Sequence, residues 1–260
     1  METKGITTMV CFHDLLGFGN MVSVSGGTLD SKMGEIAHRR IDLLRQTVGE
    51  VAKEFPEGTS LFQMNDSAVA SCDIDLSIDS SHIDAAAMSS IIPQNEIAIK
   101  ALHFLCASSI LHRNTALKEL RQRIGPAGRT FVVLGKRWPV TNYEDNVTDV
   151  PDLQANLAFS EAYIADSMGS KAGFTAGAWD SIYINDLMWF FLTLIGKPLS
   201  GLSSLLKTFP LCETTAFPKC LCASDIKEIE TIIFHRKRVF HNINSQLTTG
   251  ITEFIGDINA

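Results

Sequence analysis

The chain has 260 residues, with 22 Lys and Arg against 29 Asp and Glu, and a net charge of -7. This acidic balance argues against general nucleic-acid binding, because phosphate contacts need clustered basic side chains. It remains compatible with a small anionic ligand held by metal ions. The longest apolar run, Leu187 to Ile195, is too short to cross a bilayer, and no stretch has the pattern of a secretion signal. We therefore expect a cytoplasmic protein that contacts neither nucleic acid nor a membrane.

The first elements follow from local sequence patterns. Apolar and β-branched residues at 7–12 predict a buried strand that ends at Asp14, and the glycines after it permit a tight turn. Apolar residues at helical spacing predict a long amphipathic helix over 29–55. Two short strands, 60–64 and 68–72, then meet at a polar turn that carries Asp66. The order is strand, helix, hairpin, with one acidic residue after the first strand and one in the hairpin.

The second half of the chain continues with alternating elements. Residues 73–90 are rich in Asp and Ser and predict a loop or an exposed edge, after which helical spacing returns over 96–113. Residues 129–135 predict a further strand. Two more helices are predicted at 153–168 and 225–247.

Asp14 and Asp66 form the constellation that can carry chemistry. Small hard cations take oxygen ligands, and a pair of them both activates an attacking hydroxyl and neutralises a triphosphate. Two carboxylates on adjacent central strands are therefore what a two-metal phosphoryl-transfer site requires. Acidic residues at strand ends are also common in solvated loops, so the spacing by itself leaves both interpretations open.

Four motifs, in the same order along the chain, resemble those of the class III adenylyl and guanylyl cyclases. FHDLLGF at residues 12–18 resembles the F-x-D-I-x-G-F opening, and MNDSAVA at residues 64–70 resembles the I-G-D-S-x-M-A hairpin. The residues from Arg129 to Gly135 have the spacing of the R-x-G-I-x-x-G strand, and Asn156-Leu157-Ala158 resembles the V-N-x-A helix. The resemblance covers about residues 7–176.

The resemblance implies an α+β fold, a ferredoxin-like palm with helices on one face of a central, mostly antiparallel sheet. It implies a catalytic domain at residues 1–185, which leaves a helical C-terminal extension at 186–260, packed on that domain or on the dimer partner. The implied assembly is a homodimer with sites at the interface. The implied reaction is an in-line attack of the ribose 3′-hydroxyl on the α-phosphate of a nucleoside triphosphate, with release of pyrophosphate.

By position, the resemblance also implies the metal ligands and the catalytic groups. Two divalent cations, Mn²⁺ or Mg²⁺, bind to Asp14, Leu15 and Asp66. Asn156 corresponds to the helix asparagine that orients the ribose and the transition state. Arg129, from the matching strand, is counted with Asp14, Asp66 and Asn156 as a catalytic residue.

Substrate binding falls to the turn after the first strand and to one hairpin residue. A glycine-bearing turn that leads into a helix offers backbone N–H groups to an anion, here the triphosphate. These are the N–H groups of Leu15, Leu16, Gly17 and Phe18. Phe62 stands four residues before the hairpin Asp, where purine cyclases place a polar Lys or Glu. A phenyl ring stacks on any base but does not hydrogen-bond to a purine edge, so the purine-reading pattern is absent.

A second departure concerns the arginine that the family places four residues after the helix asparagine, because Ser160 stands there. Arg129, Lys136 and Arg137 are the cations that offer the charge instead. These departures, with the leucines after Asp14 and the Ala162-Tyr163 pair, resemble the bacterial pyrimidine cyclases of the Pycsar anti-phage systems. That resemblance implies cyclic UMP or cyclic CMP as a second messenger for a separate effector protein. UTP is favoured as substrate, and CTP is the alternative.

Other interpretations stay open. His13 either contacts a phosphate or serves as a structural hydrogen-bonding group, Tyr163 either stacks on the base or packs in the core, and Asp149 is a candidate base-reading residue. The chain can also be a catalytically degenerate, nucleotide-binding regulatory module with the same fold. Against that stands the retention of both carboxylates, which repel each other unless a metal neutralises them. The lack of a GG-[DE]-[DE] hairpin disfavours a dinucleotide or oligonucleotide synthase.

Overall fold

The computed structural model describes the N-terminal region almost completely and shorter parts of the rest. The described residues are 5–74, 96–125, 128–139, 151–169, 174, 182–189, 207–210 and 239–243. Most of the Asp- and Ser-rich segment at 73–90, the candidate base-reading Asp149 and most of the predicted helix at 225–247 lie outside them.

The described strands form one seven-stranded sheet in the order β2-β3-β1-β4-β5-β7-β6. Their bounds are β1 (Ile6–Leu15), β2 (Thr59–Met64), β3 (Ser67–Ile74), β4 (Gly128–Arg137), β5 (Ile182–Asn185), β6 (Lys207–Pro210) and β7 (Val239–Ile243). All neighbouring pairs are antiparallel except β4 and β5, which run parallel. The predicted α+β class with a mostly antiparallel sheet is confirmed.

Helices flank this sheet. They are α1 (Phe18–Ser25), α2 (Lys32–Val51), α4 (Glu96–Gln122) and α5 (Leu157–Met168), with short 3-10 turns η1 (Ala52–Glu54) and η4 (Pro151–Leu153). The helices predicted at 29–55, 96–113 and 153–168 correspond to α2, α4 and α5. The sequence pattern does not predict α1, because this short segment is built largely from Gly, Asn, Ser and Val, which are poor helix formers. None of the helices in the described residues has the length and apolarity to span a bilayer.

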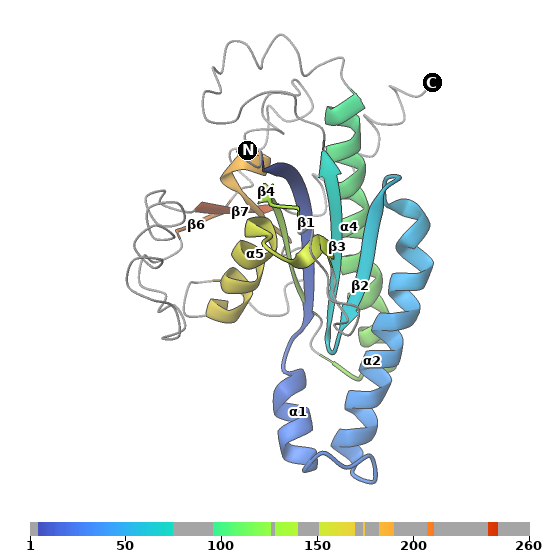
Figure 1. Ribbon diagram of the computed structural model, residues 1–260. Coiled ribbons are helices and arrows are strands. Elements are labelled where there is room, and N and C mark those ends of the chain that lie inside the picture. The colour runs from blue at the N-terminus through green and yellow to red at the C-terminus, as the bar shows by residue number, and fades with distance from the viewer. Residues whose placement is uncertain are drawn as a thin grey trace, which may run out of the picture.

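The sheet carries a core on each face. Met9 and Cys11 of β1 belong to one core, whereas Val10 and Phe12 belong to the other, and all four are buried. Helices α1, α2 and α4 cover the first core, and α5 covers the second (Figure 1). The prediction of helices on one face was therefore wrong. A central strand that is apolar on both faces needs cover on both.

The C-terminal segment differs from its prediction as well. Residues 239–243, inside the helix predicted at 225–247, form β7, which pairs with β5 and β6. The Val, Phe and Ile in this stretch suit a strand as well as an apolar helix face, and the pairing with β5 decides between them. The expected helical extension at 186–260 thus contributes β6 and β7 to the same sheet as β1. The division at residue 185 stays a prediction.

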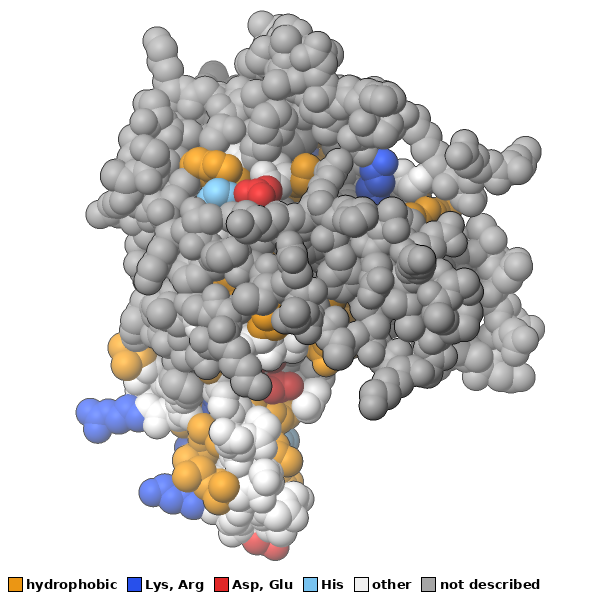
Figure 2. Space-filling view, turned by 90° about the vertical axis from the view of Figure 1, so that its left-hand side faces the viewer, with side chains coloured by type: hydrophobic (Ala, Val, Ile, Leu, Met, Phe, Trp, Pro, Cys, Tyr) orange, Lys and Arg blue, Asp and Glu red, His pale blue; other side chains and the backbone are white. Residues whose placement is uncertain are grey.

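One end of the molecule projects beyond the sheet. Helix α1 and the start of α2 form this projection at the bottom of Figure 1. Figure 2 shows hydrophobic side chains among polar ones on it, and the exposed apolar residues of this end are Val22, Val24, Leu29 and Met33. These side chains lie outside both cores.

Two glycines of α2 provide a matched test of this packing. A Cβ at Gly34 would lie 1.9 Å from the carbonyl oxygen of Thr28, whereas a Cβ at the exposed Gly49 would meet nothing within 4 Å. We expect Gly34→Ala to lower the free energy of unfolding by about 1–3 kcal/mol, because backbone must move. Gly49→Ala should raise it by about 0.5–1 kcal/mol through helix propensity. Urea denaturation checks both, and equal effects of the two substitutions would contradict the close approach at Gly34.

Candidate functional site

The two acidic residues meet at one end of the sheet. Asp14 lies at the end of β1 opposite Ser67 of β3, whose hydroxyl donates to Asp14 Oδ1 at 2.7 Å. Asp66 occupies the turn between β2 and β3, and its backbone oxygen accepts from the Leu15 N–H at 3.1 Å. Asn65 lets this turn close, because it adopts a φ of 55° that Asn tolerates better than most residues. The structure brings the two predicted metal-binding positions together.

On its other side, Asp14 lies opposite Arg129 of β4. Arg129 is buried and binds α5, where its Nε donates to Asp166 Oδ1 at 2.9 Å and its Nη2 to the Asp166 carbonyl at 3.0 Å. Asp166 is a residue of this site that sequence reasoning missed. It lies in the last turn of α5, where the helix dipole disfavours an acidic side chain, and that position signals a cationic partner.

Negative charge exceeds positive charge around Asp14. Burial raises the pKa of Asp14 to about 7, with further increases from Asp166 and Asp66, while Ser67 and Arg129 oppose the shift. Burial also raises the pKa of Asp66 and that of Asp166, although Arg129 lowers the latter and Arg40 lowers the former. Carboxylates that resist ionisation in this way need a further cation to hold all of them charged.

The turn after β1 presents backbone to solvent. Gly17 is the N-cap of α1, has a φ of 74° and provides no side-chain cap, so the first N–H groups of α1 lack that partner. The side chains of Leu15, Leu16 and Phe18 are buried, whereas Gly17 is exposed. The apolar side chains anchor the turn, and its exposed backbone suits an anion at a helix N-terminus.

Comparisons with known proteins match this architecture at the level of fold. No protein-family model and no curated protein matches the chain. The structure of a bacterial light-regulated adenylyl cyclase is similar with a TM-score of 0.50 and 9% identity over 98% of this chain and 58% of that chain. The chain has the palm fold of the cyclases.

Two further solved structures are similar at lower scores. A second structure of a bacterial light-regulated adenylyl cyclase has a TM-score of 0.48, 9% identity and the same coverage of 98% and 58%. A class III adenylyl cyclase-like ATP-binding protein from Pseudomonas aeruginosa has a TM-score of 0.42 and 12% identity over 97% of this chain and 43% of its own. The chain thus spans 58% of the length of the light-regulated cyclases that it matches.

Within this palm, Asn156 lies far from the two carboxylates. It forms a bridge with Arg137, at the end of β4 opposite Arg129. The two arginines are eight residues apart, which at about 3.3 Å per residue is roughly 26 Å. Asn156 is buried as the N-cap of α5, and its side chain accepts from the Phe159 N–H at 3.0 Å and donates to the Asp152 carbonyl at 2.7 Å. The structure does not bring Asn156 to Asp14 within one chain.

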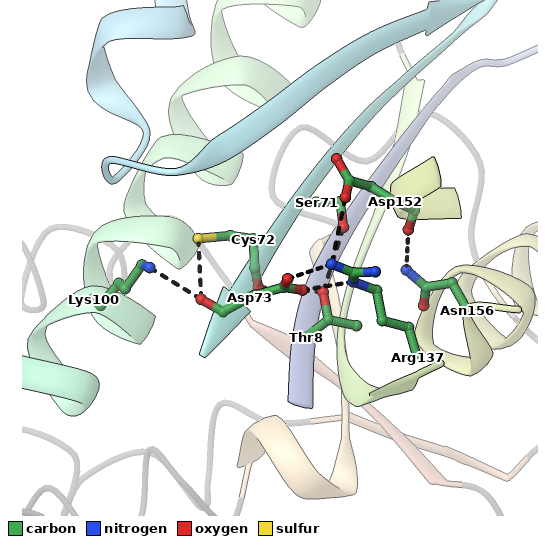
Figure 3. A network of polar contacts seen from close by, with 8 residues as sticks. All are labelled: Thr8, Ser71, Cys72, Asp73, Lys100, Arg137, Asp152 and Asn156. Atoms are coloured by element: carbon green, nitrogen blue, oxygen red, sulfur yellow. Dashed lines mark hydrogen bonds and ion pairs between the residues drawn. The ribbon is translucent and has the colours of Figure 1, made fainter. Parts of the chain in front are cut away.

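Arg137 is the centre of a polar network beside Asn156. Its Nε donates to Asp73 Oδ1 at 2.8 Å and its Nη2 to Asp73 Oδ2 at 2.5 Å, while Asp152 lies 3.6 Å away (Figure 3). Arg129, Lys136 and Arg137 are the predicted substitutes for the arginine that is absent at position 160. Of these three, Arg137 lies next to Asn156. Arg129 lies instead at the Asp14 end of β4.

Aromatic side chains line the α5 face of the palm next to Asp14. Phe62 of β2 is half-buried against the same core as Phe12. Tyr163 of α5 is 56% exposed, stacks on Phe159 at 6.2 Å and meets the Phe12 ring edge-on at 5.9 Å. Its interpretation as a core residue was wrong. Tyr163 therefore adds an exposed aromatic ring against the buried Phe12, which lies two residues before Asp14.

His13 has a structural role on the opposite face. Its ring is fully buried, and Nδ1 shares a hydrogen bond of 2.8 Å with the hydroxyl of Thr130. Burial lowers its pKa to about 3, with smaller contributions from His112 and Arg40, so the ring is neutral. A contact between His13 and a substrate phosphate does not fit this placement.

The residues present fit a divalent cation. Asp14, Asp66 and the backbone carbonyl of Leu15 are hard oxygen donors at the point where negative charge is in excess. In the described part of the chain, no three His, Cys, Asp or Glu side chains cluster as a metal site by themselves. A cation here would complete its coordination with the carbonyl, water and substrate oxygens.

The charge excess predicts a pH-dependent stability. The pKa of Asp14 is about 7 in the folded protein against a reference of 3.8, so the contribution of Asp14 to the free energy of unfolding is largest in acid and is lost as pH rises through 7. Asp14→Asn removes the titrating group and with it this loss of stability. In EDTA, we expect the free energy of unfolding of the variant to rise relative to that of wild type by about 2–3 kcal/mol between about pH 5 and about pH 8. Urea denaturation measures it, with the exposed Asp30→Asn as control, and a pH-independent difference would contradict the assignment.

Proposed function

We propose that the chain is a metal-dependent nucleotide cyclase, which converts a nucleoside triphosphate into its 3′,5′-cyclic monophosphate and pyrophosphate. The observation that carries the proposal is the meeting of Asp14 and Asp66, with excess negative charge, beside the exposed turn at Gly17. A cation-binding pair next to an anion-binding turn is what a triphosphate and its metal ions require. The palm fold agrees with this activity but does not establish it.

Each part of the site has a task in this reaction. Asp14, Asp66 and the Leu15 carbonyl would hold two divalent cations, Mn²⁺ or Mg²⁺, which when bound neutralise the triphosphate and lower the pKa of the attacking hydroxyl. The N–H groups of Leu16, Gly17 and Phe18 would bind the triphosphate, whereas the predicted N–H of Leu15 already donates to the Asp66 carbonyl. Arg129 forms an ion pair with Asp166, so its charge acts on the carboxylates of the site and does not remain free. The work of this chain is positioning and charge neutralisation.

A pyrimidine base is the substrate feature that we propose, with UTP favoured over CTP. Phe62 has no hydrogen-bonding group, and the exposed Tyr163 adds a second aromatic ring on the same face. Such a surface favours stacking and lacks the side chain with which purine cyclases read the base. The role of the cyclic UMP or cyclic CMP in anti-phage defence, through a separate effector, rests on the resemblance to Pycsar cyclases.

The position of Asn156 supports a homodimer with composite sites. Asn156 and Arg137 lie at one end of β4, roughly 26 Å from Arg129 at about 3.3 Å per residue. If Asn156 contributes to catalysis, it acts on the carboxylates of a second copy. Arg137 beside it is then the cation closest to the role of the arginine absent at Ser160.

One observation favours the alternative, a nucleotide-binding regulatory module without activity. Asn156 is 2% exposed, and both ends of its side-chain amide are used, with Oδ1 capping α5 and Nδ2 donating to the Asp152 carbonyl. Ser160 closes the same turn by donating to the Asn156 carbonyl at 3.0 Å. A buried cap has a sufficient structural reason to be there. A measurement of turnover distinguishes the two functions, because only the cyclase forms a product.

A nucleotide survey tests the activity. Purified protein is incubated with Mn²⁺ and each of ATP, GTP, CTP and UTP, and products are resolved chromatographically. We expect a cyclic pyrimidine nucleotide, and we expect Asp66→Ala to lower the rate at least about 100-fold because cation binding is lost. The exposed Asp42→Asn serves as the matched control and should retain the rate. A purine product contradicts the base assignment, and metal-dependent binding without any product supports the regulatory module instead.

Mixing two variants tests the composite site. Asp66→Asn removes a metal ligand, and Asn156→Ser keeps a cap but loses the amide. We expect each variant alone to be inactive and an equal mixture to recover about a quarter of the wild-type rate, because half of the dimers then hold one intact site. Native mass spectrometry verifies that mixed dimers form. Mixed dimers without recovered activity would place the whole site in one chain.

A further inference from the structure

A fully buried ion pair lies behind the turn that follows β1. Arg40 of α2 and Glu119 of α4 both have 0% exposed side chains, and Arg40 Nε contacts Glu119 Oε1 at 2.5 Å. Burying two charges has a desolvation cost that attraction only partly repays, and apolar residues of similar volume often join two helices at least as well. The neighbouring positions of α2 at this interface, Ala37 and Leu44, are in fact apolar and buried. The pair is therefore poorly explained by stability alone.

Two further observations point the same way. Arg40 Nη2 and Glu119 Oε2 are buried without a hydrogen-bond partner, which leaves part of the desolvation cost uncompensated. Gly125 makes room for the pair, since a Cβ there would lie 2.5 Å from Arg40 Nε and 2.7 Å from Glu119 Oε1. A side chain at position 125 would therefore collide with the ion pair.

The guanidinium reaches beyond the helix interface. Arg40 Nη1 donates to the carbonyl of Leu16 at 2.9 Å and lies 3.6 Å from the sulfur of Met21 in α1. Glu119 fixes one edge of the guanidinium through Nε, so the direction of the Nη1 donor is set. One side chain of α2 therefore connects α4, the turn and α1.

The contact with Leu16 determines how the next N–H group is presented. The carbonyl of Leu16 and the N–H of Gly17 belong to one planar peptide, in which a trans bond points them in opposite directions. The carbonyl is directed at the buried Arg40, so the Gly17 N–H is directed away from it. Gly17 itself is exposed and has a φ of 74°, a left-handed conformation that glycine adopts without a steric cost. Because glycine has the widest choice of backbone conformations, a fixed carbonyl in the preceding peptide restricts it more than it would another residue.

We infer that Arg40, held by Glu119, is a positioning residue that fixes the Leu16–Gly17 peptide so that the turn presents the Gly17 N–H to the triphosphate of the substrate. The inference rests on the proposed function for the identity of the anion. Arg40 does not touch the substrate. Its effect is to preorganise a donor that otherwise samples several orientations before binding.

The test replaces the charged pair by an apolar pair. Arg40→Met with Glu119→Leu keeps the volume of the interface and should leave the midpoint of urea unfolding unchanged or higher. Binding of inorganic tripolyphosphate in excess Mn²⁺, measured by calorimetry, should weaken by about tenfold. The matched control is Lys118→Met with Glu50→Leu, because this half-exposed pair joins the same two helices through a contact of 2.5 Å. The control should bind tripolyphosphate as wild type does.

Each outcome decides the inference. Unchanged binding by a folded double variant overturns it, and so does an equal loss in the control. If the double variant does not fold, Arg40→Lys takes its place, since it keeps the charge but cannot bond to Glu119 and Leu16 in the same forked geometry. The Gly17 amide resonance should then shift less on addition of tripolyphosphate than in wild type, and an equal shift overturns the inference.

The two proposals fail separately. Wild-type protein that binds tripolyphosphate but forms no cyclic nucleotide refutes the cyclase activity, and it leaves the role of Arg40 to be decided by the binding data. Wild-type protein that binds no tripolyphosphate at all overturns the role of Arg40, because no anion then uses the turn.

Discussion

The register of β1 with β3 and β4 is the constraint on which the candidate site depends. Asp14 is placed opposite Ser67 on one side and Arg129 on the other, and both pairings hold at once. Because successive side chains of a strand alternate between faces, a slip of one residue would bring His13 to the α5 face and bury Asp14 beneath α4. The apolar residues that fill both cores, from Met9 to Phe12, enforce the register. Packing on two faces thus determines where the chemistry lies.

The electrostatics of the site follow from what lies on each face of that strand. On the α5 face, Arg129 is shared among Asp14 and Asp166, and the pKa of each carboxyl is raised. On the α2 and α4 face, the neutral His13 adds no charge and Arg40 is balanced by Glu119. The described residues around Asp14 and Asp66 therefore keep a net negative charge in the free protein. Such a site is expected to gain stability when a cation binds, because the cation supplies the positive charge that the protein lacks.

The parts of this fold that follow from the sequence are those set by local patterns. The strand to Asp14, the hairpin around Asp66 and the helices α2, α4 and α5 each have their own periodicity or turn residues, so they are predicted with errors mainly at the ends. Segments governed by distant partners are not. The sequence of β7 predicts a helix because the spacing of its apolar residues fits both a helix and a strand. Only the pairing with β5 decides for a strand. The sequence does not show that Asp166 belongs to the site, because its partner Arg129 reaches α5 only through the folding of β4. The sequence pattern does not distinguish Arg40 from the other arginines of its amphipathic helix, although Arg40 is fully buried.

The length of β4 separates Asn156 from the two carboxylates of the same chain. The strand carries Arg129 at the end occupied by Asp14 and Arg137 at the end occupied by Asn156, so one chain has two unlike polar ends. In a twofold-symmetric dimer, any contact from the first end of one copy to the second end of its partner is repeated in reverse. An arrangement that places the Asn156 end of one palm over the Asp14 end of the other therefore creates two equivalent sites rather than one. In the dimer that we propose, an isolated chain would have Asp14, Asp66 and the turn but would lack the Asn156 that the partner supplies. The monomer would then be inactive because the length of β4 separates Asn156 from the carboxylates of its own chain, even with every side chain present.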